Sequence, residues 1–301
     1  MEKGPQNKHA FHLAGIVPVA GQPLDFEFPW HDCLQPISKN YLAVERAVME
    51  CAWAGCETIW IACHNEMQPL IKHRLGDYVQ DPLWAYRKFD PRPRDDQKLI
   101  PIFYVPIHPK DRDRRDCLSW GALHAASTAS RVVSSLSKWT TPDRYYVAFP
   151  YGVYQPSIVR EYRKRISDTN GFFISYNGQT VKDGKYLGFT FDADDYSLCV
   201  KRLREEGTGV KLPGSKKFDT ETLPIEERWS ARFFSLDKVF QYVKIDGAVV
   251  AETPWYHTID SWDNLCEYLG SKEQKLMRKP PKTHLSGRFT FNRTTLEKND
   301  N

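Results

Sequence analysis

The sequence has no apolar run long enough to cross a bilayer, and this absence is the first limit on what the protein can be. A membrane-spanning helix needs about 20 mostly apolar residues, whereas the hydrophobic 41% of this chain is scattered among polar and charged residues. The first twelve residues, MEKGPQNKHAFH, also lack the apolar core of a secretion signal. We therefore expect a cytoplasmic protein with no membrane partner.

Paired cysteine motifs are absent as well. The seven cysteines are odd in number, scattered, and include no Cys-x-x-Cys pair, which favours reduced thiols over a disulfide framework or a cysteine-rich zinc site. Cys51, Cys56 and Cys63 lie close together on apolar stretches, so we expect them to be buried structural thiols.

Most of the chain also lacks net charge. From residue 271 onward there are eight Lys/Arg and three Asp/Glu, a net charge of +5, which leaves −1 for the rest because the whole chain carries +4. The body of the protein is thus expected to be nearly neutral. Contact with nucleic acid is therefore expected only through the basic tail, residues 271–301, for which a solvated extension or a packing arm remains the alternative.

Short β-branched runs alternate with amphipathic helical patterns through residues 13–154. This alternation predicts a mostly parallel sheet with helices on both faces, a three-layer αβα domain of the α/β class. In such a sheet, ligands bind at the carboxyl ends of the strands. The strands are expected at residues 13–21, 56–63, 99–107 and 144–154, and the helices at residues 38–55, 65–79 and 120–139.

The second half of the chain changes character. Asn177-Gly178 and Asp183-Gly184 are turn signals that predict a hairpin within residues 171–196. A strand followed by a helix is expected at residues 227–243. The pattern of residues 254–270 predicts a strand end and then a helix capped by Asp260 or Ser261.

Several segments, taken in order, resemble the sugar-nucleotide pyrophosphorylases, which are nucleotidyltransferases of the GT-A type that join a nucleoside triphosphate to a sugar phosphate. The segments are GIVPVAG (15–21), LQPI (34–37), YLAVERAVMECAWAGCETIWIAC (41–63), WGALHAA (120–126), RYYVAFPYGVY (144–154), WSARFFSLDKVFQYV (229–243) and WYHTIDSWDNLCEYL (255–269). The resemblance implies a GT-A-like domain at residues 13–270. Its nucleotide-binding half is 13–154 and its acceptor-binding half 155–270, with an N-terminal extension at 1–12.

The resemblance also implies where the nucleotide and a metal ion, Mg²⁺ or Mn²⁺, would bind. The family's Gly-x-Gly-Thr-Arg loop corresponds to Gly21-Gln22-Pro23-Leu24-Asp25, which has one glycine and no arginine. One metal-binding Asp is expected near residues 150–152, where no carboxylate stands. The other is expected near Thr258, so that Asp260 is the best metal candidate. The implied nucleotide-binding residues are Val19, Ala20, Gly21, Gln22, Gly121 and Ala122.

A different loop offers the cations that the first loop lacks. Residues 108–116, HPKDRDRRD, precede the helix that contains Gly121, and at the carboxyl edge of a parallel sheet arginines can bind phosphates bidentately. We therefore assign the catalytic phosphate contacts to Arg112, Arg114 and Arg115. The loop's own three aspartates leave a self-neutralised, solvated loop as the alternative, and His31 is a further candidate for a positive charge.

The function expected from these observations is transfer of a nucleotidyl group to a phosphorylated small molecule, with a nucleotide or sugar nucleotide as partner. One alternative is a GT-A glycosyltransferase that holds its metal through Asp192 and Asp194, because Asp-x-Asp is a pattern of carboxylates that suits Mg²⁺ or Mn²⁺. The other is a binding or scaffold protein that kept the fold without the reaction.

Overall fold

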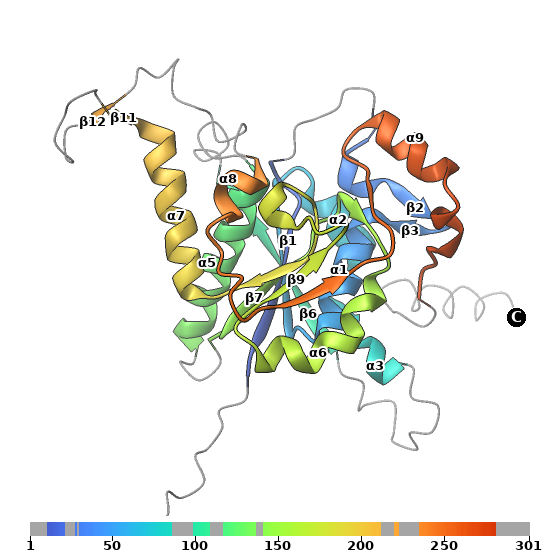
Figure 1. Ribbon diagram of the computed structural model, residues 1–301. Coiled ribbons are helices and arrows are strands. Elements are labelled where there is room, and N and C mark those ends of the chain that lie inside the picture. The colour runs from blue at the N-terminus through green and yellow to red at the C-terminus, as the bar shows by residue number, and fades with distance from the viewer. Residues whose placement is uncertain are drawn as a thin grey trace, which may run out of the picture.

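An eight-stranded sheet forms the centre of the protein (Figure 1). The computed structural model describes residues 11–21, 28, 30–85, 99–108, 117–136, 141–211, 220–222 and 235–280. The strand order is β13-β9-β10-β7-β1-β4-β6-β5. In chain order the strands are β1 Leu13–Pro18, β4 Thr58–Cys63, β5 Tyr78–Gln80, β6 Leu99–Pro106, β7 Arg144–Val147, β9 Phe172–Ser175, β10 Phe189–Phe191 and β13 Val249–Glu252.

The sheet is mostly parallel. β1 pairs in parallel with both β4 and β7, and β4 with β6. Only β10 and β5 run against their neighbours. The expected α/β class and mostly parallel sheet are therefore confirmed, and the carboxyl ends of β1, β4, β6 and β7 meet at one edge.

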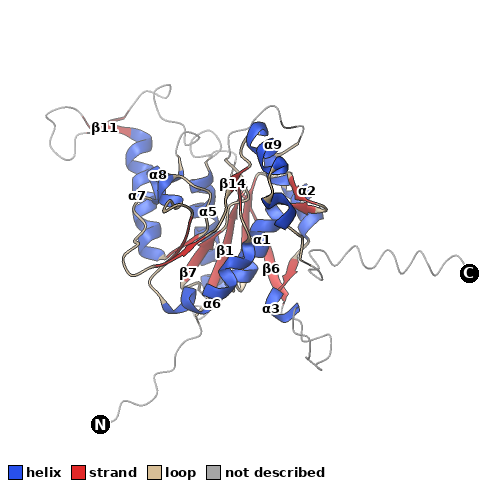
Figure 2. Ribbon diagram, turned by 45° about the vertical axis from the view of Figure 1, so that its right-hand side comes forward, coloured by secondary structure: helices blue, strands red, loops and turns tan. Residues whose placement is uncertain are grey.

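Helices cover both faces of this sheet, as the views in Figures 1 and 2 show. One face carries α1 (Ala43–Ala54) and α6 (Val159–Asp168), which pack against each other. The other carries α5 (Leu118–Leu136), α7 (Ala193–Thr208) and α8 (Leu236–Phe240). The remaining helices are α2 (Gln68–Leu75), α3 (Pro82–Ala85) and α9 (Trp262–Gly270), and among the described helices none is long and apolar enough to span a membrane.

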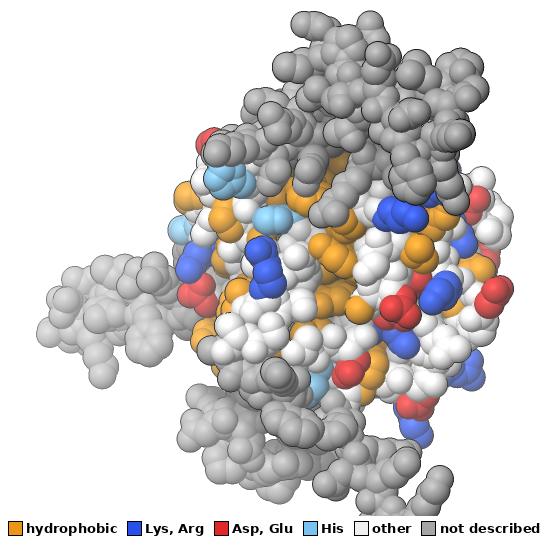
Figure 3. Space-filling view, turned by 90° about the vertical axis from the view of Figure 1, so that its left-hand side faces the viewer, with side chains coloured by type: hydrophobic (Ala, Val, Ile, Leu, Met, Phe, Trp, Pro, Cys, Tyr) orange, Lys and Arg blue, Asp and Glu red, His pale blue; other side chains and the backbone are white. Residues whose placement is uncertain are grey.

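Three short two-stranded ladders complete the architecture of the described residues. They are β2 (Pro36–Ser38) with β3 (Tyr41–Leu42), β8 (Gly152–Val153) with β14 (His257–Thr258), and β11 (Gly209–Lys211) with β12 (Thr220–Thr222). On the side of the molecule that carries α7, side chains of both charge signs are interspersed (Figure 3). This described surface therefore offers no broad patch of one sign for a polyanion.

Several expected element ends are confirmed. Gly55 ends α1 with the left-handed φ of 94°, and the Ser261 side chain accepts a hydrogen bond from the Asn264 amide at the start of α9. The expected hairpin is present, because β9 and β10 pair antiparallel and Asn177 and Gly178 both have positive φ. The helix expected near residue 240 is α8, whereas the strand expected before it falls on residues outside the described ranges.

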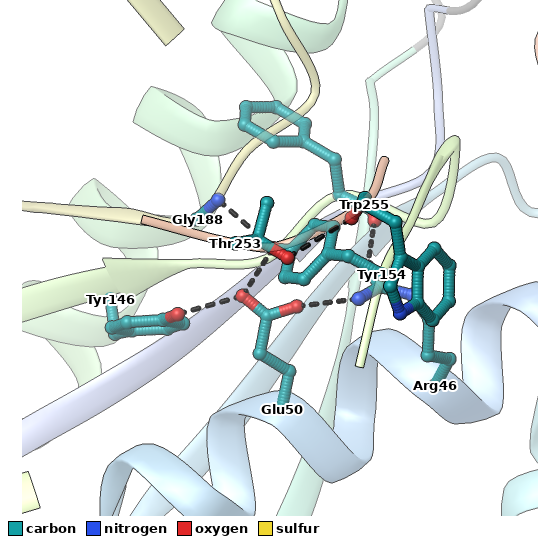
Figure 4. Close-up of polar contacts among 8 residues, drawn as sticks. Arg46, Glu50, Tyr146, Tyr154, Gly188, Thr253 and Trp255 are labelled. Atoms are coloured by element: carbon teal, nitrogen blue, oxygen red, sulfur yellow. Dashed lines mark hydrogen bonds and ion pairs between the residues drawn. The ribbon is translucent and has the colours of Figure 1, made fainter. Parts of the chain in front are cut away.

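Helix α1 is more deeply buried than its apolar pattern predicts. All twelve of its residues are buried, including Glu45, Arg46 and Glu50. Glu50 accepts hydrogen bonds from the Tyr146 and Tyr154 hydroxyls at 2.7 Å each, and Arg46 Nη1 donates to Glu50 Oε2 at 2.8 Å (Figure 4). These partners make the burial tolerable, because a buried charge is stable only when it is paired and hydrogen-bonded.

The three clustered thiols behave as expected. Cys51, Cys56 and Cys63 are all fully buried, and every described cysteine is free. Cys51 and Cys56 pack beside Gly15 of β1, where an added Cβ would lie 2.8 Å from the Cys51 side chain. The prediction of buried structural thiols is thus confirmed for the packing between α1 and β1.

Candidate functional site

The segment after β1 turns sharply against the start of α5. The backbone amides of Val19 and Ala20 both donate to the carbonyl oxygen of Ala62, at 2.9 and 3.0 Å. Gly21 then has a φ of 91°, and a Cβ there would lie 2.4 Å from the backbone of Cys117. A residue with a side chain does not fit at this position, so glycine is needed for this close approach.

The first turn of α5 lies beside the same segment. Gly121 and Ala122 are buried, and a Cβ at Gly121 would lie 3.4 Å from the carbonyl oxygen of Ala20. The structure therefore brings together five of the residues that the resemblance assigns to the nucleotide. Gln22 is the sixth and lies outside the described residues. The Val19 and Ala20 amides are already bonded within the sheet, so they have no hydrogen left for a phosphate oxygen.

The two positions at which the resemblance expects metal carboxylates lie side by side. Thr258 of β14 pairs with Gly152 of β8, and the amide of Ile259 donates to the Tyr151 carbonyl at 2.9 Å. Neither position carries a carboxylate, so neither supplies the charged oxygen ligand that the resemblance requires for a divalent ion. Asp260 follows directly, where its Oδ1 accepts a hydrogen bond from the Asn264 side chain at 2.7 Å.

A buried tyrosine occupies the place beyond the end of β7. The Tyr151 hydroxyl donates to the Val19 carbonyl at 2.8 Å and lies 3.4 Å from Asp32 Oδ1. Burial, with the neighbouring charge of Asp32 as the next cause, raises the pKa of Tyr151 well above its ordinary value, so its phenol remains a neutral donor. This side chain thus ties the β7 end to the segments that follow β1.

A short 3₁₀ turn, Asp32–Leu34, brings a second carboxylate to this place. Asp32 Oδ1 accepts from the Cys33 amide at 2.8 Å and lies 2.8 Å from His31 Nδ1. Asp32 Oδ2 is buried and has no hydrogen-bond partner among the described residues. Burial, then the charges of Asp32 and Cys63, raises the pKa of the Cys33 thiol well above its ordinary value.

Among His31, Asp32 and Cys33, only His31 was predicted from the sequence, as a candidate for a positive charge, and neither Asp32 nor Cys33 was considered as a metal ligand. The available signal was three consecutive residues, His-Asp-Cys, each of which can bind a metal ion. The burial of Asp32 could not be predicted from the sequence, because it depends on Tyr151, which is 119 positions away.

The remaining predicted metal residues lie at the other edge of the sheet. β10 is antiparallel to β7, and its last residue, Phe191, pairs with Tyr145 near the β7 start. Asp192 Oδ1 accepts from the amides of Asp194 and Asp195 at 2.9 Å each, and so caps α7. The structure does not bring Asp192 and Asp194 together with Asp260.

The predicted phosphate-binding arginines, Arg112, Arg114 and Arg115, lie outside the described residues. The flanking residues are described and lie at the carboxyl edge: the Ile107 amide bonds to the Cys63 carbonyl at 3.1 Å, and Cys117 packs against Gly21.

A separate cavity of about 540 Å³ lies between α1 and α6, lined by Leu13, Gly55, Arg160 and other residues.

Comparison with known proteins supports the fold. No protein-family profile matches the chain, and no curated protein matches its sequence. A crystal structure of a Bacillus anthracis protein described as a glucose-1-phosphate thymidylyltransferase, in complex with sucrose, is similar with a TM-score of 0.51 and 10% identity, over 85% of this chain and 93% of that one. This similarity shows a nucleotidyltransferase-like fold. At 10% identity it does not show the activity or the substrate of this protein.

Two crystal structures of Rv0371c from Mycobacterium tuberculosis H37Rv, one of them a complex with manganese, also match. Their TM-scores are 0.43 and their identities 10% and 11%. The matches cover 87% of this chain and 99% and 100% of the Rv0371c chains.

Proposed function

We propose that the protein binds a nucleoside triphosphate or a nucleotide sugar at the carboxyl edge of its sheet and transfers a nucleotidyl group to a phosphorylated small molecule. The observation that carries this proposal is the convergence of three segments at one edge: residues 19–21, the first turn of α5, and the β8–β14 ladder. Open parallel sheets bind ligands at this edge. These segments also occur in the chain order that the resemblance requires.

The base would lie against the first turn of α5. Gly121 and Ala122 are buried, so the exposed surface here comes from Trp120, which is half-buried and stacks with His124 at a ring distance of 5.9 Å. Aromatic faces bind bases by stacking without a strict preference for one base. Trp120 is therefore the residue that we expect to contact the base.

The phosphates need cations, and the loop that follows β1 (residues 19–30, the β1 loop) contains no Lys or Arg. Asp32 is acidic and the Val19 and Ala20 amides are bonded to Ala62. The segment between His108 and Cys117 begins and ends at this edge, and it carries Arg112, Arg114 and Arg115. Guanidinium groups bind phosphates through paired, charge-assisted hydrogen bonds, so we assign the phosphate contacts to these three arginines.

Nucleotidyl transfer also needs a divalent ion, because the transition state concentrates negative charge on phosphate oxygens. Tyr151 and Thr258 lack the carboxylates that the resemblance requires for Mg²⁺ or Mn²⁺ at the two expected positions. Asp260 lies within two residues of Thr258, and its carboxylate has the oxygen ligands that these ions prefer. When bound, the ion would neutralise phosphate charge, and Asp260 is the residue that we expect to orient it.

A nucleotide-binding protein without transfer activity is the second candidate. The specific observation in its favour is the buried phenol of Tyr151. It lies where a metal carboxylate is expected, and its hydroxyl already donates a hydrogen bond to the Val19 carbonyl. Under this alternative the nucleotide would bind at the same edge, and no pyrophosphate would be released.

Thermal-shift and calorimetric titrations with nucleoside triphosphates and nucleotide sugars, with and without Mn²⁺, test binding. The variant R112A/R114A/R115A is expected to bind the triphosphate at least tenfold more weakly, because each charge-assisted bond contributes about 1.5–3 kcal/mol. Its matched control is K164A/R165A, which removes exposed cations from α6 and should leave affinity unchanged. If no nucleotide raises the melting temperature, both candidates are refuted.

A pyrophosphate-release assay with a panel of sugar phosphates then separates the two candidates. Release that needs Mn²⁺ and falls with Asp260→Ala supports transfer. Tight nucleotide binding that needs no metal, with no product from any acceptor, supports the binding protein instead.

A further inference from the structure

The 3₁₀ turn after the β1 loop gathers three different metal-binding side chains at one buried place. His31, Asp32 and Cys33 each offer one ligand atom, and these atoms lie within 4.8 Å of one another. We propose that these three residues form a site for a transition-metal ion of the zinc class.

The distances are close to those that such an ion requires. Zinc bonds to nitrogen, oxygen and sulfur at about 2.0–2.3 Å in a tetrahedral arrangement, which places two ligand atoms of one ion about 3.5 Å apart. The three ligand atoms lie within 4.8 Å of one another, which is close to this separation. Asp32 and Cys33 belong to the same 3₁₀ turn, and His31 is the residue directly before it.

The unpartnered oxygen of Asp32 is an independent observation for the site. Asp32 is only 2% exposed, and its Oδ2 lacks a hydrogen-bond partner among the residues the structure describes. Oδ1, in contrast, meets the Cys33 amide, His31 Nδ1 and the Tyr151 hydroxyl. An ion pair between His31 and Asp32 provides a partner for Oδ1 only. A metal ion would also provide a partner for Oδ2, whose burial without one is costly.

The mixed ligands decide which ion fits. One imidazole nitrogen, one carboxylate oxygen and one thiolate sulfur suit Zn²⁺ or Co²⁺, whereas Mg²⁺ and Ca²⁺ take oxygen ligands only. The site therefore differs from the Mg²⁺ or Mn²⁺ position that the resemblance implies near residue 258. Three protein ligands leave one tetrahedral position open for water or a ligand oxygen.

The surroundings give this ion two roles. His31 is partly exposed, so the site has a route to solvent, while Cys33 and Asp32 are buried. The ion would fix the position of Asp32, which the hydroxyl of Tyr151 contacts from beyond the end of β7. It would also add positive charge beside the carboxyl edge, where the β1 loop has none. The site does not depend on the nucleotide proposal, since its three ligands are complete without a nucleotide.

Cobalt titration of the full-length, chelator-treated protein tests the site in the absence of nucleotide. A cobalt–thiolate bond produces a near-ultraviolet charge-transfer band, so we expect this band to saturate at one Co²⁺ per chain and to disappear when Zn²⁺ is added. Cys33→Ser should abolish the band, and Asp32→Asn should weaken Co²⁺ binding at least tenfold. The matched control is Cys266→Ser, which removes an exposed thiol and should keep the full band.

Two results would overturn the proposal: no band in the wild-type protein at excess Co²⁺, or a full band that survives Cys33→Ser. The wild-type measurement needs no variant to fold, and far-ultraviolet circular dichroism verifies the fold of each variant. Zn²⁺ should also raise the wild-type melting temperature, because an ion that binds only the folded state stabilises it by mass action. Nucleotide affinity, measured with chelator present, tests the proposed function separately.

Discussion

The substitution Glu50→Gln tests the buried ion pair between Arg46 and Glu50 of α1, which Tyr146 of β7 also contacts. Glu50 receives donors from Arg46, Tyr146 and Tyr154, and all four side chains are fully buried. Glutamine has nearly the same shape and can still accept from the two hydroxyls through its oxygen. Its amide nitrogen then faces Arg46 Nη1, donor against donor, and the Arg46 charge loses its counterion.

The expected cost follows from the environment of Arg46. After the substitution, Arg46 keeps its bond to the Phe149 carbonyl at 2.6 Å and its position 4.5 Å from the centre of the Tyr154 ring, but neither neutralises its charge. Removing one partner of a buried ion pair costs about 3–5 kcal/mol. The melting temperature should therefore fall by roughly 6–20 °C.

Urea denaturation, followed by circular dichroism and tryptophan fluorescence, measures the loss. Glu161→Gln is the matched control, because Glu161 is exposed on α6 and its change should stay within about 0.5 kcal/mol. The double variant R46M/E50Q should be destabilised by clearly less than the sum of R46M and E50Q, since the two residues are directly coupled. A loss below about 1 kcal/mol for Glu50→Gln, or strict additivity, would refute this reasoning.

Three further predictions concern the carboxyl edge and the buried phenols. Gly152→Ala should destabilise the protein by at least about 1–3 kcal/mol, because its Cβ would lie 2.0 Å from the Tyr186 carbonyl oxygen; Gly270→Ala, with open space around it, is the control in the same urea experiment. Tyr151→Phe should cost about 1–3 kcal/mol by leaving a buried carbonyl without its donor, and a change under 0.5 kcal/mol would contradict this. Stability should begin to fall above about pH 8.5, where the unfolded cysteines ionise and the buried thiols of Cys33 and Cys51 do not. Above about pH 10, where unfolded tyrosines ionise, it should fall by about a further 1.4 kcal/mol per pH unit for each buried phenol, which is the slope that linkage requires. The sign follows because burial raises the folded-state pKa, so that only the unfolded chain releases these protons; flat urea midpoints from pH 9 to 11.5 would contradict this prediction for Tyr146, Tyr151 and Tyr154.

The elements that depend on local patterns were predictable from the sequence. Alternating apolar runs predicted the order of strands and helices. Gly55 predicted the end of α1, and Ser261 predicted the start of α9. Periodicity indicates which face of a helix is apolar, but it does not show what covers the opposite face. For this reason the burial of Arg46 and Glu50 could not be inferred, since it depends on β7 and on Tyr154 more than 100 positions away.

The candidate site was harder to predict for the same reason. Asp192-x-Asp194 is compatible with a metal site or a helix cap on sequence alone, and only the antiparallel placement of β10 locates it at the edge opposite Gly21. No local pattern predicts the burial of Asp32, whose carboxylate lies against Tyr151. Contacts between distant segments decide both cases, and no local pattern encodes them.

A crystal structure of the protein soaked with a nucleoside triphosphate and Mn²⁺ tests the central claim most directly. We predict phosphate density beyond the carboxyl ends of β1 and β4 beside Gly21, the base against Trp120, and an anomalous manganese peak next to Asp260. An ordered nucleotide in the cavity lined by Leu13 and Arg160, or beside Asp192, would contradict the claim, as would the absence of nucleotide density at saturating concentration.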